Sequence, residues 1–86
     1  MQSNLSEIQV TPIKPSDGLI GFASLVLNNN LYLSGIGIYA KVSGGYRLTY
    51  PTRGKTGLNI FHPINRLLAQ EIEQAVVTRF EEIMNK

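Results

Sequence analysis

The chain has 86 residues, 43% of them hydrophobic, with a formal net charge of +2 and no cysteine. A chain of this length forms a single domain, residues 1–86, that buries roughly 60–65% of its unfolded surface and leaves little room for a deep catalytic cleft. Without cysteine there is no disulfide framework and no thiolate metal site, and the single histidine would need carboxylate partners to hold zinc. We therefore expect no cofactor and no metal.

The same composition gives no sign of a membrane segment. The longest apolar runs fall far short of the ~20 residues that a membrane span requires. The N-terminal segment reads MQSNLSEIQ, which has neither the basic flank nor the apolar run of a signal peptide. We therefore expect a cytoplasmic protein without membrane contact.

The first half of the chain has the patterns of β-strands. Residues 8–14 read IQVTPIK and alternate apolar with polar positions, as a half-buried strand does, and the proline suits a sheet edge. After a turn at PSDG, residues 21–27 read GFASLVL and are apolar at both parities, which predicts a strand covered on both faces. One helix cannot cover two faces of a sheet, so this strand predicts that two chains pair as a homodimer.

In the next predicted strand the apolar residues change from odd-numbered to even-numbered positions. It follows the asparagine run at 28–30, which suits a hairpin turn because asparagine tolerates left-handed backbone angles. Leu31 and Leu33 share one parity, whereas Ile36 and Ile38 share the other. A strand that keeps one face buried can change parity only by bulging, and the Ser34-Gly35 pair is the predicted site because glycine permits the bulge conformation.

The rest of the chain predicts two more strands and one helix. After a turn at SGG, residues 46–50 read YRLTY and are predicted to form a strand with Arg47 on its solvated face. Residues 58–61 read LNIF and are predicted to form a last short strand. From Asn65, the predicted N-cap, apolar residues recur with helical spacing, namely Leu68, Ile72, Ala75, Val76, Phe80 and Ile83. The predicted class is α+β, an antiparallel sheet of about five strands followed by one long C-terminal helix.

Charge is unevenly distributed along the chain. Four of the six acids, Glu71, Glu73, Glu81 and Glu82, fall in the C-terminal segment. Every charged residue between Gly18 and Gln70 is basic, and these residues are Lys41, Arg47, Arg53, Lys55 and Arg66. A stretch of one sign favours anionic partners such as nucleic acid, although scattered cations are also ordinary solubilising surface.

The segment 49–65, TYPTRGKTGLNIFHPIN, combines a Gly-Lys-Thr tripeptide with the chain's one histidine. A Walker-type phosphate loop needs a glycine where Thr49 stands and must open a helix, whereas a strand is predicted after Thr56. What remains is a glycine-bounded loop with Arg53 and Lys55, which either contacts a phosphate backbone or is a solvated turn. The segment therefore carries no nucleotide-binding signature.

The histidine predicts structure rather than catalysis. His62 has no serine or carboxylate motif beside it that would orient it for acid–base chemistry. Together with Pro63 and Asn65 it is predicted to shape the corner between the last strand and the helix, because a residue before proline avoids helical angles. We therefore expect a protein that is not an enzyme and has no small-molecule substrate.

Three segments carry a resemblance to a known family. They are ASLVLNNNLYLSGIGIY at 23–39, HPIN at 62–65, and EIEQAVVTRFEEI at 71–83. In this order, with a proline and a basic loop between the first two, the chain resembles the SpoVG septation-protein family (stage V sporulation protein G) from about residue 8 onward. The resemblance implies a bacterial cytoplasmic regulator that forms dimers, binds DNA and RNA, and takes part in sporulation, septation and control of gene expression.

The chain departs from the family pattern in its charged positions. The loop before HPIN is shorter and keeps Pro51 and Arg53, Ser34-Gly35 replaces a usual His-Asp pair, and Gly37 stands where an arginine is common. Fewer cations are therefore available to contact nucleic acid than in typical members.

Two functions of different classes follow from the sequence. In the first, Lys41, Arg47, Arg53, Lys55 and Arg66 neutralise phosphates while Tyr32 and Tyr39 stack on bases of DNA or RNA. In the second, the protein is a non-catalytic structural or protein-interaction module whose dimer surface is the functional face. The run of basic residues favours the first.

Overall fold

The computed structural model describes residues 4–54 and 58–85. It contains a four-stranded antiparallel sheet in the order β1-β2-β3-β4, a separate two-stranded hairpin, and one helix, which confirms the predicted α+β class. The elements are β1 (Leu5–Ser16), β2 (Leu19–Leu27), β3 (Leu31–Ala40), β4 (Tyr46–Thr49), β5 (Thr52–Arg53), β6 (Leu58–Asn59) and α1 (Arg66–Met84).

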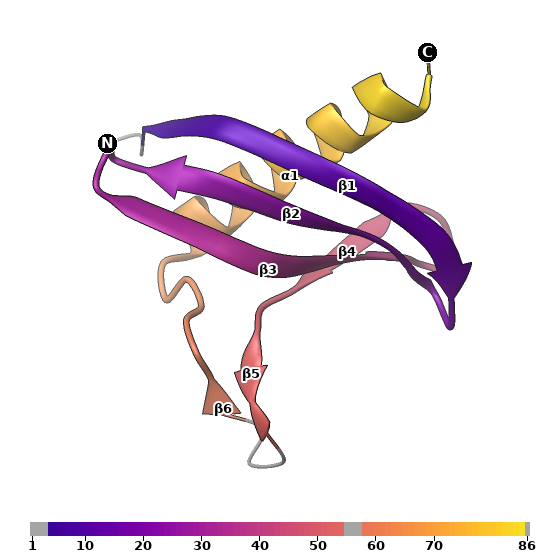
Figure 1. The fold of residues 1–86 in the computed structure, drawn as a ribbon, viewed down its shortest axis with the longest axis horizontal. Coiled ribbons are helices and arrows are strands. Elements are labelled where there is room, and N and C mark those ends of the chain that lie inside the picture. The colour runs from indigo at the N-terminus through magenta and orange to yellow at the C-terminus, as the bar shows by residue number, and fades with distance from the viewer. Residues whose placement is uncertain (1–3, 55–57, 86) are drawn as a thin grey trace.

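The sheet and the helix form two layers. Figure 1 shows α1 crossing one face of the sheet, behind β1, β2 and β3, while the chain after β4 leaves the sheet and returns through β6. Within the described residues no other helix or strand lies over the opposite face. In the described part of the chain, no helix is both long enough and apolar enough to span a membrane. The described residues therefore cover one face of the sheet and leave the other without a second layer.

The turns use the residues that the sequence predicted. Asp17 and Gly18 connect β1 to β2 with φ of 52° and 91°, the two positive angles of a type I′ hairpin. Asn28 and Asn29 have φ of 52° and 58°, which confirms left-handed asparagines between β2 and β3. Asn28 also holds the start of the chain, because its backbone N–H donates to the Asn4 carbonyl at 2.7 Å.

The predicted bulge is present in β3. Ile36 pairs with Ala23 of β2, whereas Leu33 pairs with Leu25, so three steps along β3 match two along β2. The extra residue lies at Ser34-Gly35, where Gly35 has φ of 77°. Because of this bulge, the leucines before it and the isoleucines after it all face α1.

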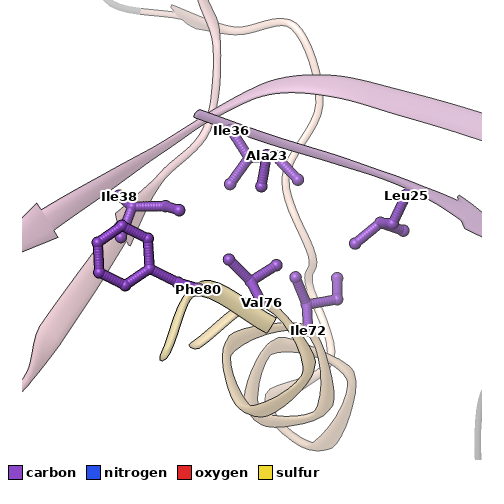
Figure 2. Close-up of a cluster of buried hydrophobic side chains, with 7 residues drawn as sticks. All are labelled: Ala23, Leu25, Ile36, Ile38, Ile72, Val76 and Phe80. Carbon is purple, nitrogen blue, oxygen red and sulfur yellow. The ribbon is translucent and has the colours of Figure 1, made fainter. Parts of the chain in front are cut away.

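The core lies between the sheet and α1. Figure 2 shows side chains of β2 and β3 pointing toward side chains of α1, all of them apolar. The buried residues are Ala23, Leu25, Ile36, Ile38, Ile72, Val76 and Phe80. Tyr46 of β4 closes one end, with its ring 5.6 Å from that of Phe80 in an edge-on arrangement. This confirms that the apolar stripe of the helix packs on the sheet.

The helix begins at the residue that the sequence predicted. Asn65 is its N-cap, with extended φ and ψ of −105° and 126°. Its side-chain oxygen accepts the N–H groups of Leu67 and Leu68 at 2.8 and 3.2 Å. Two donors of the first turn that have no partner within the helix are thereby satisfied.

The segment predicted as a last strand of the sheet forms a separate arm. Leu58 and Asn59 pair with Arg53 and Thr52, and the Ile60 N–H donates to the Pro51 carbonyl at 2.7 Å. Pro51 follows β4 and has no N–H for a sheet ladder, so the chain turns away from β3. We call residues 50–54 and 58–61 the arm, and its base is closed by the rings of Tyr50 and Phe61 at 5.9 Å.

Replacing Gly35 tests the dependence of the sheet on the bulge. We expect Gly35→Ala to lower the free energy of unfolding by at least about 1 kcal/mol, because a side chain is strained at φ of 77°. Ser34→Ala is the matched control, since it changes the neighbouring, exposed position of the same bulge. Urea denaturation followed by circular dichroism measures both, and equal stability of the two variants would contradict the role of Gly35.

Candidate nucleic-acid interface

The sheet face turned away from α1 is assembled by cross-strand pairs. Residues directly opposite each other in an antiparallel sheet share a face, so the register identifies the members. We call this surface the open face. Its paired residues are Ser6, Gln9, Thr11, Leu19, Phe22, Ser24, Val26, Tyr32, Gly37, Tyr39, Arg47 and Thr49.

Two aromatic side chains of the open face are exposed to solvent. Tyr32, a predicted stacking residue, is 68% exposed and lies opposite the half-buried Val26. Phe22 is 42% exposed and lies between Thr11 of β1 and Gly37 of β3. Both rings therefore present π-surface on the same side of the sheet.

The ring of Tyr39, the other predicted stacking residue, contacts the side chain of Arg47. The guanidinium carbon of Arg47 lies 5.2 Å from the centroid of the Tyr39 ring, within the range of a cation–π contact. Gly37 makes room for this pair, because a Cβ there would meet Thr49 Oγ1 at 2.6 Å and Tyr39 Cε1 at 3.4 Å. Tyr39 is half-buried as a result, and it positions the Arg47 cation at this end of the open face.

The charged residue among the paired positions of the open face is a cation, while Glu7 and Lys14 lie in the two irregular stretches of β1 that have no paired partner. Arg47 is its cation, and the exposed Lys41 follows in the turn after β3, where its N–H donates to the Gly45 carbonyl at 3.0 Å. None of the paired positions of the open face is acidic. The helix on the other side of the sheet carries Glu71, Glu73, Glu81 and Glu82.

The remaining predicted cations lie elsewhere. Arg53 is on β5 in the arm, and Arg66 is the first residue of α1, at the point where the chain returns from the arm. Lys55 lies outside the described residues. The structure therefore brings Arg47 and Lys41 to one end of the sheet, and it does not join them with Arg53 and Arg66 into one patch.

The predicted corner is formed at the surface. His62 is exposed, and its Nδ1 lies 3.4 Å from the carbonyl oxygen of Pro63. Asn65 caps the helix three residues later. Among the described residues, no group of three or more His, Cys, Asp or Glu side chains is placed to hold a metal ion.

One titratable side chain is clearly perturbed. Burial, and to a lesser extent the negative charge of Glu73, raises the pKa of Tyr50 above its usual range near 10. The phenol of Tyr50 is therefore neutral at physiological pH, where it packs edge-on against Phe61 at the base of the arm.

A groove of about 920 Å³ runs between β1 and α1. Its apolar lining includes Leu5 and Ile8 of β1 with Leu67 and Ala75 of α1, and its rim is polar. The Arg79–Glu82 ion pair at this rim, 3.4 Å long, is exposed and contributes little to stability. None of the cations, tyrosines or corner residues predicted from the sequence lines the groove.

Phe22 belongs to the candidate interface but was not predicted as a site residue. The signal was present in the sequence, because Phe22 and Val26 make β2 apolar on the parity opposite to Ala23 and Leu25. That pattern indicates an apolar face without identifying what covers it. The register of β3 and β4 was needed to place Tyr32 and Arg47 on the same surface.

No protein-family model matches the chain, and no curated protein matches it either. The resemblance to the SpoVG family rests on the three quoted segments. The assignment of a function rests on that resemblance together with the geometry above.

Replacing His62 tests its assignment as a corner residue. We expect His62→Gln to lower the free energy of unfolding by at most about 1 kcal/mol, since it loses one exposed hydrogen bond, and to leave nucleic-acid affinity unchanged. Asn65→Ala, at the same corner, should lose about 1 kcal/mol through the helix cap. Urea titrations and anisotropy binding measure both. A hydrolytic or transferase activity abolished by His62→Gln in a folded protein would reverse the assignment.

Proposed function

We propose that this protein is a small, dimeric, cytoplasmic bacterial regulator of the SpoVG type that binds DNA or RNA and takes part in sporulation, septation and control of gene expression. The biological role is supported by the resemblance of the three segments. The observation that carries the biochemical proposal is the separation of charge across the sheet. Arg47 and Lys41 lie at one end of the open face, next to the β1–β2 turn that contains Asp17, whereas α1 on the other side of the sheet carries four glutamates and two arginines.

Because glutamates outnumber arginines on α1, the end of the open face with Arg47 and Lys41 is the more favourable side for a polyanion. Arg47 and Lys41 are exposed, so they can contact phosphates without moving out of the fold. Arg53 of β5 and Lys55, two residues later in the sequence, supply further positive charge after β4. Phosphate contacts of this kind provide most of the affinity of sequence-independent binding and fix the orientation of the protein.

The apolar residues at both parities of β2 predict pairing of two chains through the open face, but that face also carries Gln9, Thr11 and Ser24, so we place the contact between two copies on a different surface. Ile60 of the arm, Ile64 before the helix and Leu67 in its first turn are 65, 92 and 64% exposed. Large apolar side chains that follow one another in one region in this way are typical of a protein interface. In this arrangement the open face stays available to nucleic acid when two chains pair.

The same apolar residues support the second candidate, a protein-interaction module without nucleic-acid binding. In that case the exposed surface around Ile60 and Ile64 is the functional face, and the cations are ordinary surface charges. The two candidates differ in one measurable property, which is salt-dependent affinity for nucleic acid.

A nucleic-acid titration at several salt concentrations tests the proposed function. For duplex DNA, each phosphate contact contributes about 0.9 to the slope of log affinity against log salt, so Arg53→Ala combined with Lys55→Ala should flatten that slope by roughly 1.5–2 units. Arg79→Ala is the control for the loss of a cation outside the proposed contact, because Arg79 lies on α1 beside Glu82 and should leave the slope unchanged.

Two outcomes of the titration would contradict parts of the proposed function. If the double variant keeps the affinity and slope of the parent, Arg53 and Lys55 are excluded as phosphate contacts. If the parent binds no DNA or RNA oligonucleotide even at low salt, the interaction module replaces the nucleic-acid regulator as the function.

Light scattering behind a sizing column tests the dimer. We expect the mass of two chains at micromolar concentration, and Ile64→Asp should shift it toward one chain because a charge would be buried in the contact. Val42→Asp is the matched control, since Val42 is fully exposed in the turn before β4, away from the arm. A parent protein with the mass of one chain throughout this range would contradict pairing.

A further inference from the structure

The aromatic rings of the open face follow one another in the strand direction across the neighbouring strands β2 and β3, and we call this series of rows, from Tyr32 to Arg47 of β4, the line. Phe22 stands opposite Gly37, and Tyr32 stands opposite Val26, four residues from Phe22 along β2. With a strand rise of about 3.3 Å per residue, these two rows are about 13 Å apart. Tyr39 and Arg47 form a row two residues beyond Gly37, so the line from Tyr32 to Arg47 is about 20 Å long.

The ends of this line differ in chemistry. Tyr32 and Phe22 offer exposed rings, whereas the Tyr39 ring is engaged by Arg47. Two stacking surfaces are therefore followed by a guanidinium group that is fixed by its contact with Tyr39. Bases stack on aromatic side chains irrespective of their sequence, and a neighbouring cation contacts the backbone.

We propose, on the basis of the nucleic-acid function above, that the open face binds single-stranded DNA or RNA by stacking bases on Phe22 and Tyr32, with Arg47 contacting a phosphate. A duplex hides the π-faces of its bases within the stack, so these rings can engage only unpaired nucleotides. In the part of the chain that the structure describes, no helix lies in front of the open face that could enter a major groove. The surface therefore selects single strands over duplexes.

The polar members of the open face argue against a second copy as its occupant. Ser24 lies between Phe22 and Val26 along β2, and on β1 Gln9 lies opposite Ser24 and Thr11 opposite Phe22. Packing two such faces together would bury these groups and Arg47, at a cost unless each finds a partner. Bases and phosphates, in contrast, carry hydrogen-bond acceptors and negative charge that complement hydroxyl, amide and guanidinium groups.

Fluorescence anisotropy with three labelled probes tests this inference. The probes are single-stranded DNA, single-stranded RNA and duplex DNA of one sequence, each of about 12 nucleotides or base pairs, within the ~4–16 nucleotides that a small binding domain covers. The full chain and its variants Phe22→Leu and Tyr32→Leu are compared. Phe22→Tyr and Tyr32→Phe are the matched controls because they keep an aromatic ring.

We expect the parent to bind both single strands more tightly than the duplex. Each leucine variant should weaken single-strand binding roughly 5- to 150-fold, the range found for the loss of one base–aromatic stack, whereas the aromatic controls keep the parent affinity. Because both side chains are exposed, the variants should fold as the parent does, which circular dichroism checks.

The contrary results distinguish a failure of this inference from a failure of the proposed function. If the leucine variants bind single strands as the parent does, or if the parent prefers duplex, this inference is wrong while the proposed function stands. If the leucine variants change the mass in light scattering from two chains to one, the open face is a contact between copies and the inference is also wrong. If the parent binds none of the three probes at low salt, the proposed function fails, and the inference fails with it.

Discussion

The left-handed backbone at Gly35 determines which residues of β3 face the helix and which face solvent. In a regular strand Tyr32 and Tyr39 would lie on opposite faces, because seven residues separate them and side chains alternate. The extra residue in the bulge brings both to the open face and turns Leu33, Ile36 and Ile38 toward α1. The core and the candidate interface therefore depend on the same backbone angle.

The single helix imposes the second constraint. It covers one face of a four-stranded sheet, and the seven buried residues of the core all lie on that side. A small domain with so few fully buried side chains has limited stability, so a strained bulge or a lost helix cap removes a large part of it. The opposite face contributes less to folding and is free to carry aromatic and cationic side chains.

Two surfaces remain outside the core, and their chemistry differs. The open face combines aromatic rings with hydroxyl and amide groups and Arg47, whereas Ile60, Ile64 and Leu67 around the arm and the start of the helix are apolar. Apolar surface favours contact between protein chains, and an aromatic, cationic surface favours nucleic acid. The proposed pairing of chains and the proposed binding of single strands therefore do not compete for the same residues.

The local features could be predicted from the amino-acid sequence, because each depends on neighbouring residues: the asparagine turn, the bulge at Ser34-Gly35, the cap at Asn65 and the apolar stripe of the helix. The α+β class could be predicted from the same patterns. The pairing of residues 58–59 in an arm instead of at the edge of the sheet, and the contact of Arg47 with the Tyr39 ring, became visible only in the folded chain. Strand periodicity indicates which side chains share a face within one strand, whereas the alignment between strands follows from long-range pairing that no local pattern encodes.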